Sequence, residues 1–311
     1  MTDAGKRRQY DVMTGEMKKI GIIAGYGNYP VLLAEFLNQK GYAVYSLCVH
    51  GQTDRRMLDF SEKSAWIGFG NFGKAVRFLR RNQVPQVTMA GGVWKRAFHR
   101  PLLIFRYLPD FYTIRLFSPH FIFRTKDCKV DSLLLTCVDA FERYGIQVVP
   151  GTDIAPELLV KRELLTRRAP TAAQWKDIQF GWKIAKEMGR LDIGQTVTVK
   201  DRSVVAIEAL EGTDECILRS GNLCKGFTVI KVAKPQQDMR FDLPCFGMQT
   251  VKNIAAAGGK VLAIEADRSI FVGQQDVIDF ADKNGIAVLG LIQEDVSRDE
   301  YHSGGFRPKK C

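Results

Sequence analysis

The chain has 311 residues, with 45 lysines and arginines against 34 aspartates and glutamates, which gives a formal net charge of +11. Hydrophobic residues make up 46% and charged residues 25%, a balance that excludes a fibrous or wholly disordered chain. No apolar run reaches the roughly 18 residues of a membrane-spanning helix, and the polar start does not resemble a secretory signal. Seven scattered cysteines indicate reduced thiols in a cytoplasmic protein. The positive charge favours anionic partners.

The first half alternates short apolar runs, glycine turns and amphipathic patterns. Strands are predicted at 19–24, 43–49, 86–90 and 146–149, and helices from Pro30 onward and over 74–82 and 126–144. A strand, helix and strand in succession form a parallel βαβ unit. The fold class predicted here is therefore α/β, with a Rossmann-like parallel sheet whose ligands bind beyond the carboxyl ends of the strands.

The second half has a mixed α/β pattern. It combines a predicted hairpin with further strands at 227–232, 260–265 and 287–291 and helices at 174–188, 248–257 and 275–283. We expect an N-terminal extension over 1–17, a Rossmann-like domain over 18–165, a C-terminal α/β catalytic domain over 166–295 and a tail over 296–311. Residues 151–172, which contain two prolines and a basic pair, are interpreted as the connection between the domains.

Residues 96–126 differ from the rest of the chain because aromatic and branched apolar residues alternate with arginines. One interpretation is a core helix whose arginines extend to the surface. The other is a basic, aromatic surface for an anionic membrane or a lipid chain. The same composition suits single-stranded nucleic acid, but no recognised motif accompanies it, so we expect no nucleic-acid partner.

A glycine turn follows the first predicted strand and contains Gly25, Gly27 and Asn28. Such a turn can direct backbone N–H groups at an anion at the start of a helix, although a purely structural turn is an equal alternative. Pro30 occupies the position of the third fingerprint glycine, and His50 follows the second strand where an acidic residue is expected. An NAD site is therefore poorly supported.

The second half carries carboxylates and lysines near predicted strand ends. The set is Asp192, Glu208, Glu211, Asp214, Lys231, Lys234, Asp238 and Asp242. Oxygen ligands of this kind suit Mg²⁺ shared with substrate phosphates. Each residue alone can equally be a helix cap or a surface ion pair, and Thr213 with Asp214 can cap the next helix. Histidine and cysteine spacings do not favour a zinc site.

Six segments together resemble the UDP-2,3-diacylglucosamine pyrophosphatases of the LpxI type. They are IGIIAGYGNYP (20–30), IGFGNFGK (67–74), GRLDIGQTV (189–197), VVAIEALEGTDECILR (204–219), KVAKPQQDMRFDLPCFG (231–247) and an end pattern over 261–291. The order of EGTD followed by KPxQDxRxDLP is specific. The resemblance covers roughly residues 18–293, and it implies a Rossmann-like domain and an α/β domain with the lipid substrate between them.

The resemblance implies Mg²⁺-dependent cleavage of UDP-2,3-diacylglucosamine to UMP and 2,3-diacylglucosamine 1-phosphate (lipid X) in lipid A biosynthesis. It also implies a homodimer and a peripheral place on the cytoplasmic membrane surface, at the inner face of the inner membrane. Asp242 matches the family's essential aspartate. The expected substrate-binding residues are Gly25, Gly27, Asn28, Gly68, Gly70, Gln195, Thr213, Lys231, Lys234 and Gln236, and the expected metal ligands are Asp242, Asp214 and Glu211.

Two other functions fit parts of the sequence. A non-catalytic nucleotide- or lipid-binding module would need the same glycine turns, but the intact EGTD motif and Asp242 argue against it. A nicotinamide-dependent sugar-nucleotide oxidoreductase would fit the βαβ start, but the missing acidic residue argues against that.

Overall fold

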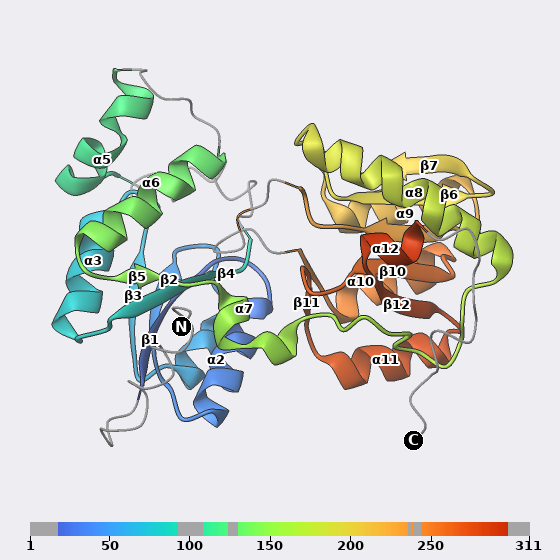
Figure 1. Cartoon of the computed structure of the whole chain (residues 1–311). Coiled ribbons are helices and arrows are strands. Elements are labelled where there is room, and N and C mark those ends of the chain that lie inside the picture. Colours follow the sequence, from blue (N-terminus) through green and yellow to red (C-terminus); the bar gives the residue numbers. More distant parts are fainter. Residues whose placement is uncertain (1–17, 93–107, 124–129, 236–237, 239–243, 298–311) are drawn as a thin grey trace, which may run out of the picture. The chain divides into compact units, whose positions relative to one another are not determined.

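A computed structural model describes residues 18–92, 108–123, 130–235, 238 and 244–297. The chain divides into two compact units, residues 1–149 and 150–311. Each unit is built around its own sheet (Figure 1). Within the described ranges, no helix combines the length and apolar character needed to cross a membrane.

The sheet of the first unit has five parallel strands in the order β3-β2-β1-β4-β5. The strands are β1 (Lys19–Ala24), β2 (Ala43–Val49), β3 (Lys63–Ile67), β4 (Gln86–Ala90) and β5 (Gln147–Val148). The predicted Rossmann-like parallel sheet is confirmed. The sequence analysis missed β3, because this edge strand begins with exposed polar residues and lacks an apolar run.

The helical elements of the first unit are α2 (Tyr29–Gln39), η1 (Arg55–Phe60), α3 (Phe72–Arg81), α5 (Phe111–Phe121) and α6 (Val130–Arg143). Pro30 lies in the first turn of α2, where its missing N–H costs no hydrogen bond. α5 comes from the basic, aromatic segment 96–126. Its described part is a surface helix and not a core helix, since Phe111 is 73% exposed and Ile114 46% exposed. The preceding residues 93–107 lie outside the described ranges.

The sheet of the second unit is mixed, in the order β12-β10-β8-β6-β7. Its strands are β6 (Thr196–Lys200), β7 (Ser203–Ile207), β8 (Thr228–Lys231), β10 (Val261–Glu265) and β12 (Ala287–Leu291). β8, β10 and β12 are parallel, whereas β6 runs antiparallel to β7 and β8. A separate parallel pair joins β9 (Cys245–Phe246) to β11 (Ile270–Phe271). The predicted mixed α/β architecture is confirmed.

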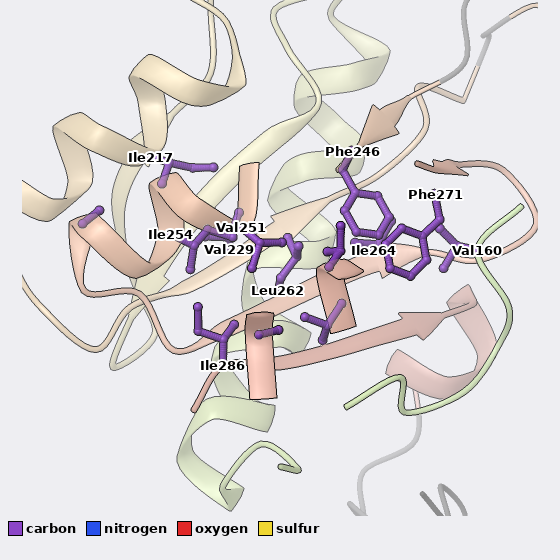
Figure 2. Packing of buried hydrophobic residues seen from close by; sticks show 14 of the residues in the cluster. Val160, Ile217, Val229, Phe246, Val251, Ile254, Leu262, Ile264, Phe271 and Ile286 are labelled. Atoms are coloured by element: carbon purple, nitrogen blue, oxygen red, sulfur yellow. The ribbon is translucent and has the colours of Figure 1, made fainter. Parts of the chain in front are cut away.

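Four longer helices pack on the faces of this second sheet: α8 (Ala172–Arg190), α9 (Thr213–Leu223), α10 (Met248–Ala257) and α11 (Gln274–Lys283). The short elements α7 (Gly151–Ile154), η4 (Pro156–Leu158) and α12 (Gln293–Val296) belong to the same unit. Trp182 of α8 is fully buried in one hydrophobic cluster. In the other, Val229 and Leu262 of the sheet pack with Ile254 of α10 (Figure 2). Burial on both faces explains why these strands read as continuous apolar runs.

The segment that we interpreted as a connection belongs to the second unit. The division falls at Val149 and Pro150, before this segment rather than after residue 165. Leu159 bridges to Ile270, and Leu164 bridges to Leu289 at the outer edge of β12. The backbone at Lys161 approaches so closely that a Cβ atom at Gly290 would overlap the Lys161 carbonyl. The segment therefore extends the sheet edge beyond β12.

Replacing Gly290 by alanine should destabilise the protein by about 2 kcal/mol, because the added methyl group must displace backbone and not a flexible side chain. Urea denaturation would measure the loss. Gly92→Ala is the control, since a Cβ atom there meets nothing within 4 Å. Equal stability of the two variants would contradict the tight packing of this segment.

Two fully buried cysteines make stability sensitive to alkaline pH. Burial raises the pKa of Cys48 to about 11 and that of Cys216 to about 12. An unfolded thiol loses its proton near pH 8.5, so between about pH 8.5 and 11 the unfolded state releases protons that the folded state keeps. We expect the free energy of unfolding to fall by about 1 kcal/mol per pH unit for each thiol above pH 9. A Cys216→Ala variant should show a shallower decline, and an unchanged slope would contradict the assignment.

Candidate functional site

The carboxyl edge of the first sheet brings two glycine turns together. Tyr26 N–H donates to the Gly92 carbonyl at 2.7 Å, and Gly92 N–H donates to the Tyr26 carbonyl at 2.9 Å. A Cβ atom at Gly25 would lie 2.5 Å from the Gly92 oxygen, so only glycine permits this approach. The turns follow β1 and β4, where the strand order changes direction. This switch point is the usual ligand position in such sheets.

Gly27 and Asn28 form the entry to α2. Gly27 has φ of +102°, a left-handed conformation that favours glycine. The Asn28 side chain accepts a hydrogen bond from Arg56 at 2.9 Å. In the described part of the chain, the amide N–H groups of Gly27 and Asn28 donate no hydrogen bond. They are thus available to an anion at the positive end of the helix.

Arg56 links this turn to the loop after β2. Its guanidinium also pairs with Asp54 at 2.7 Å, and the hydrogen bonds from Arg56 lower the pKa of Asp54 from its ordinary value. Thr53 accepts a hydrogen bond from Val49 N–H and donates one to the Ala24 carbonyl. The loop is therefore held against the end of β1.

A hollow of about 360 Å³ lies in the same loop region and is lined by His50, Gly51, Thr53, Arg55 and Trp66. The rings of His50 and Trp66 are stacked with centroids 5.5 Å apart. A planar aromatic ligand suits such a surface, and Arg55 adds positive charge. The sequence analysis noted His50 only as the residue that replaces an acid, and it assigned no role to Trp66.

The second predicted cradle, Gly68 to Gly70, holds α5 in place. Gly68 N–H donates to the Asn71 side chain at 2.8 Å, and the Gly70 carbonyl accepts from the Thr113 hydroxyl at 2.6 Å. The same hydroxyl accepts from Phe72 N–H at 3.0 Å. The Gly68 N–H thus binds within the protein. The predicted contacts of Gly68 and Gly70 with substrate stay predictions.

The second unit contains a buried lysine, Lys231, that forms no ion pair with any acid of the described residues. Lys231 ends β8 and is 4% exposed. Its ammonium donates to the Thr213 hydroxyl at 2.8 Å, and the Thr196 hydroxyl lies 3.3 Å from that of Thr213. The antiparallel register pairs Thr196 directly with Lys231. Among the ion pairs of the described residues, none involves Lys231. A buried positive charge in this setting requires an anion.

Thr213 is the first residue of α9 and does not cap it. The N-cap is Gly212, with φ of +88° and no side-chain cap hydrogen bond. The Thr213 hydroxyl is consequently available to Lys231. The start of an 11-residue helix thus lies beside the buried ammonium, and both favour negative charge.

Three buried acceptor oxygens on neighbouring residues of the chain have no hydrogen-bond donor within the described ranges: Gln195 Oε1, Glu208 Oε2 and Asp214 Oδ1. Glu208 N–H donates to the Thr196 carbonyl, and Asp214 adjoins Thr213 in sequence. Gly194 is required here because a Cβ atom would overlap the Glu208 carbonyl. Glu208 was recognised in the sequence as part of the carboxylate set but was not among the expected ligands. Its burial separates it from the other acids.

The remaining predicted residues are placed differently. Glu211 pairs with Arg219 at 2.7 Å, and hydrogen bonds from its own backbone N–H and then from Arg219 lower its pKa. Lys234 pairs with Asp192 at 2.5 Å. Asp242 and Gln236 lie outside the described residues. Within the ranges described, no group of three or more histidines, cysteines, aspartates or glutamates is arranged to hold a metal ion.

Sequence comparison finds two domain families in the chain, and their boundary near residue 160 lies about ten residues after the division between the compact units. The family described as the LpxI N-terminal domain matches residues 19–158, and the LpxI C-terminal domain matches residues 161–289. The UDP-2,3-diacylglucosamine pyrophosphatase LpxI of Caulobacter vibrioides is 31% identical over 284 residues, which cover 88% of this chain and 98% of that protein. The chain belongs to the LpxI family. Its resemblance in sequence to these pyrophosphatases is therefore confirmed.

Solved structures show weaker likeness. The ADP complex of PurK, an N5-carboxyaminoimidazole ribonucleotide synthetase, is 14% identical with a TM-score of 0.25, over 59% of this chain and 32% of that one. Biotin carboxylase from Campylobacter jejuni is 11% identical with a TM-score of 0.27, over 78% and 41%. This chain therefore spans less than half the length of either, and such low scores support no functional inference.

Replacing Lys231 by methionine should leave the stability of the LpxI-family chain unchanged or raise it by about 1 kcal/mol, because a buried unpaired charge is removed with little change in volume. Lys186→Met is the control, since Lys186 pairs with the buried Glu265 at 2.6 Å and its loss should cost about 3 kcal/mol. Thermal unfolding of both variants would measure this. A large loss at Lys231 would show that this lysine serves the fold and not a ligand.

Proposed function

We propose that this chain hydrolyses the diphosphate of UDP-2,3-diacylglucosamine, releasing UMP and lipid X in lipid A biosynthesis. Membership of the LpxI family supports the reaction, and the name of the Caulobacter relative supports the substrate. The observation in this chain that carries the proposal is the buried ammonium of Lys231, which donates to the Thr213 hydroxyl and pairs with no acid within the described ranges.

Lys231 has the properties needed to hold a phosphate of the substrate. Cleavage of a diphosphate requires neutralisation of the charge on its oxygens and a water molecule placed in line. The Lys231 ammonium, the Thr213 hydroxyl and the first turn of α9 together offer positive charge and hydrogen-bond donors. Because Lys231 is almost completely buried, its interaction with a phosphate oxygen is screened less by water than at the surface.

The magnesium ion of this proposal is supported by the chemical type of three side chains. The donor-free oxygens of Gln195, Glu208 and Asp214 are of the type that Mg²⁺ prefers, and Mg²⁺ commonly uses one or two carboxylates with substrate phosphates and water. When bound, the ion supplies charge neutralisation and an activated water. Glu208 is a better candidate than Glu211, which already binds Arg219. Asp242 is proposed to orient the water or to complete the metal site.

The first unit offers a candidate subsite for the uridine part. The amides of Gly27 and Asn28 at the start of α2 suit a phosphate. The stacked His50 and Trp66 rings suit the flat uracil base. In this proposal Gly25 does not contact the substrate, and its role is to let the turn after β1 approach the turn after β4. A homodimer at the cytoplasmic face of the inner membrane is part of the same proposal.

The test is to incubate the purified chain with detergent-dispersed UDP-2,3-diacylglucosamine and Mg²⁺ and to assay UMP and lipid X. We expect product from the wild type, none with a metal chelator and none from Asp242→Ala. Lys231→Met should lower kcat/KM by about a hundredfold or more, because it removes a preorganised cation. Lys176→Met, at an exposed position of α8, is the matched control.

Two outcomes would contradict the proposal. Substrate binding with no turnover by the wild type would favour the non-catalytic binding module. Full activity of Lys231→Met would remove the role assigned to the buried ammonium.

A further inference from the structure

A basic hollow lies between α3 and α5 of the first unit. It measures about 340 Å³, and its main lining residues are Arg77, Arg80 and Arg81 of α3, Tyr112 of α5 and Tyr144 after α6. The contacts of α5 with α3 and α6 bring these residues together (Figure 1). The arginines of α3 lie outside the basic, aromatic segment 96–126, so the sequence did not connect them with it.

Three arginines of α3 carry positive charge that pairs with no acid of the described residues. Spacings of three and four residues place Arg77, Arg80 and Arg81 on one side of the helix. In the part of the chain described, their guanidinium groups form no ion pair and no side-chain hydrogen bond. Arg80 and Arg81 lie in the last turn and stabilise the helix dipole, but Arg77 lies a turn earlier. The cluster therefore repels itself unless an anion binds.

Two tyrosine rings also line the hollow. The centroids of the Tyr112 and Tyr144 rings are 6.4 Å apart in an edge-to-face arrangement. A Cβ atom at Gly73 would lie 2.6 Å from the Tyr112 ring, so the absence of a side chain there lets the ring approach α3 closely. Packing therefore fixes the tyrosine side of the hollow, while the exposed arginines line the rest.

An exposed apolar surface adjoins the hollow through Tyr112. Along α5 and at its ends, five large apolar residues face solvent: Leu108, Phe111, Ile114, Ile122 and Phe123. Phe111 contacts Tyr112 ring to ring, with centroids 6.4 Å apart. Neighbouring exposed apolar residues on this scale are unusual on a monomer and mark a surface that binds a partner.

We propose that α3 and α5 form a docking surface for an anionic phospholipid membrane. The hollow of Arg77, Arg80 and Arg81 receives a lipid phosphate, and Tyr112 and Tyr144 lie at the level of the headgroups. Phe111 and the neighbouring aliphatic side chains enter the boundary of the acyl chains. Arg115, also exposed on α5, adds a further positive charge. Docking of this kind is independent of the reaction proposed above.

The apolar component favours a membrane over single-stranded nucleic acid. Nucleic acid would use the arginines and aromatic rings, but exposed Leu108, Ile114 and Ile122 have no counterpart in base stacking or phosphate binding. A lipid surface accounts for both the arginine hollow and the exposed apolar residues of α5, because it presents phosphates above an apolar layer.

Flotation with vesicles tests this surface. The full chain should bind vesicles of equimolar phosphatidylglycerol and phosphatidylcholine, and it should bind pure phosphatidylcholine much more weakly. The variant R77Q/R80Q/R81Q should lose about a hundredfold in partitioning to the anionic vesicles, and Phe111→Ser about tenfold. The control K176Q/K183Q/R190Q removes the same charge from exposed positions of α8 and should lose less than threefold.

The outcomes separate this proposal from the others. Equal losses in both triple variants, or unchanged binding of R77Q/R80Q/R81Q, would overturn it. So would complete displacement from vesicles by inorganic phosphate, or preferential retention of a single-stranded oligonucleotide. In detergent micelles R77Q/R80Q/R81Q should turn over substrate at the wild-type rate. An inactive wild type whose vesicle binding still depends on these arginines would contradict the proposed reaction and leave the docking surface supported.

Discussion

The buried ammonium of Lys231 is the constraint around which the second unit is arranged. Lys186 shows the ordinary solution for a lysine in this sheet, an ion pair with Glu265 that satisfies both charges. Among the described residues, the Lys231 ammonium donates instead to the Thr213 hydroxyl, which lies 3.3 Å from the Thr196 hydroxyl, at the start of a helix. A buried cation in such a place favours an anion, and the proposed binding of a substrate phosphate rests on this preference.

The glycines of the first unit show that similar motifs serve different physical ends. Gly25 lets two turns meet backbone to backbone at the sheet edge, and Gly27 supplies a left-handed residue before α2. The turn at Gly68 and Gly70 has a similar sequence, but the Gly68 N–H binds the Asn71 side chain and the Gly70 carbonyl binds the Thr113 hydroxyl of α5. The second turn therefore holds a helix, whereas the amides of the first turn are available to a ligand. Fastening α5 at its start also positions the face that we assign to the membrane.

A charge of +11 becomes informative only when it is located. Some of the basic residues form ion pairs, such as Arg162 with Asp295 and Arg219 with Glu211. Among the described residues the arginines of α3 form no ion pair, and they lie next to α5, whose aromatic residues Phe111 and Tyr112 are exposed. An enzyme acting on a lipid gains from such a surface, because adsorption to the bilayer raises the local concentration of its substrate.

The sequence by itself determined the family, the α/β class and most strands, several to the exact residue, because continuous apolar runs between glycine turns depend on local pattern alone. It also pointed to Lys231, Thr213 and the acidic set as site residues, and these roles stay predictions, as do those of Asp242 and Gln236. Only the tertiary structure decided which of these residues meet. The antiparallel pairing of β6 with β8 places Thr196 beside Lys231, and the start of α9 brings Thr213 to it from 18 residues away. Burial then separates Glu208 from the solvent-facing, arginine-paired Glu211, a distinction absent from their nearly adjacent positions in the sequence.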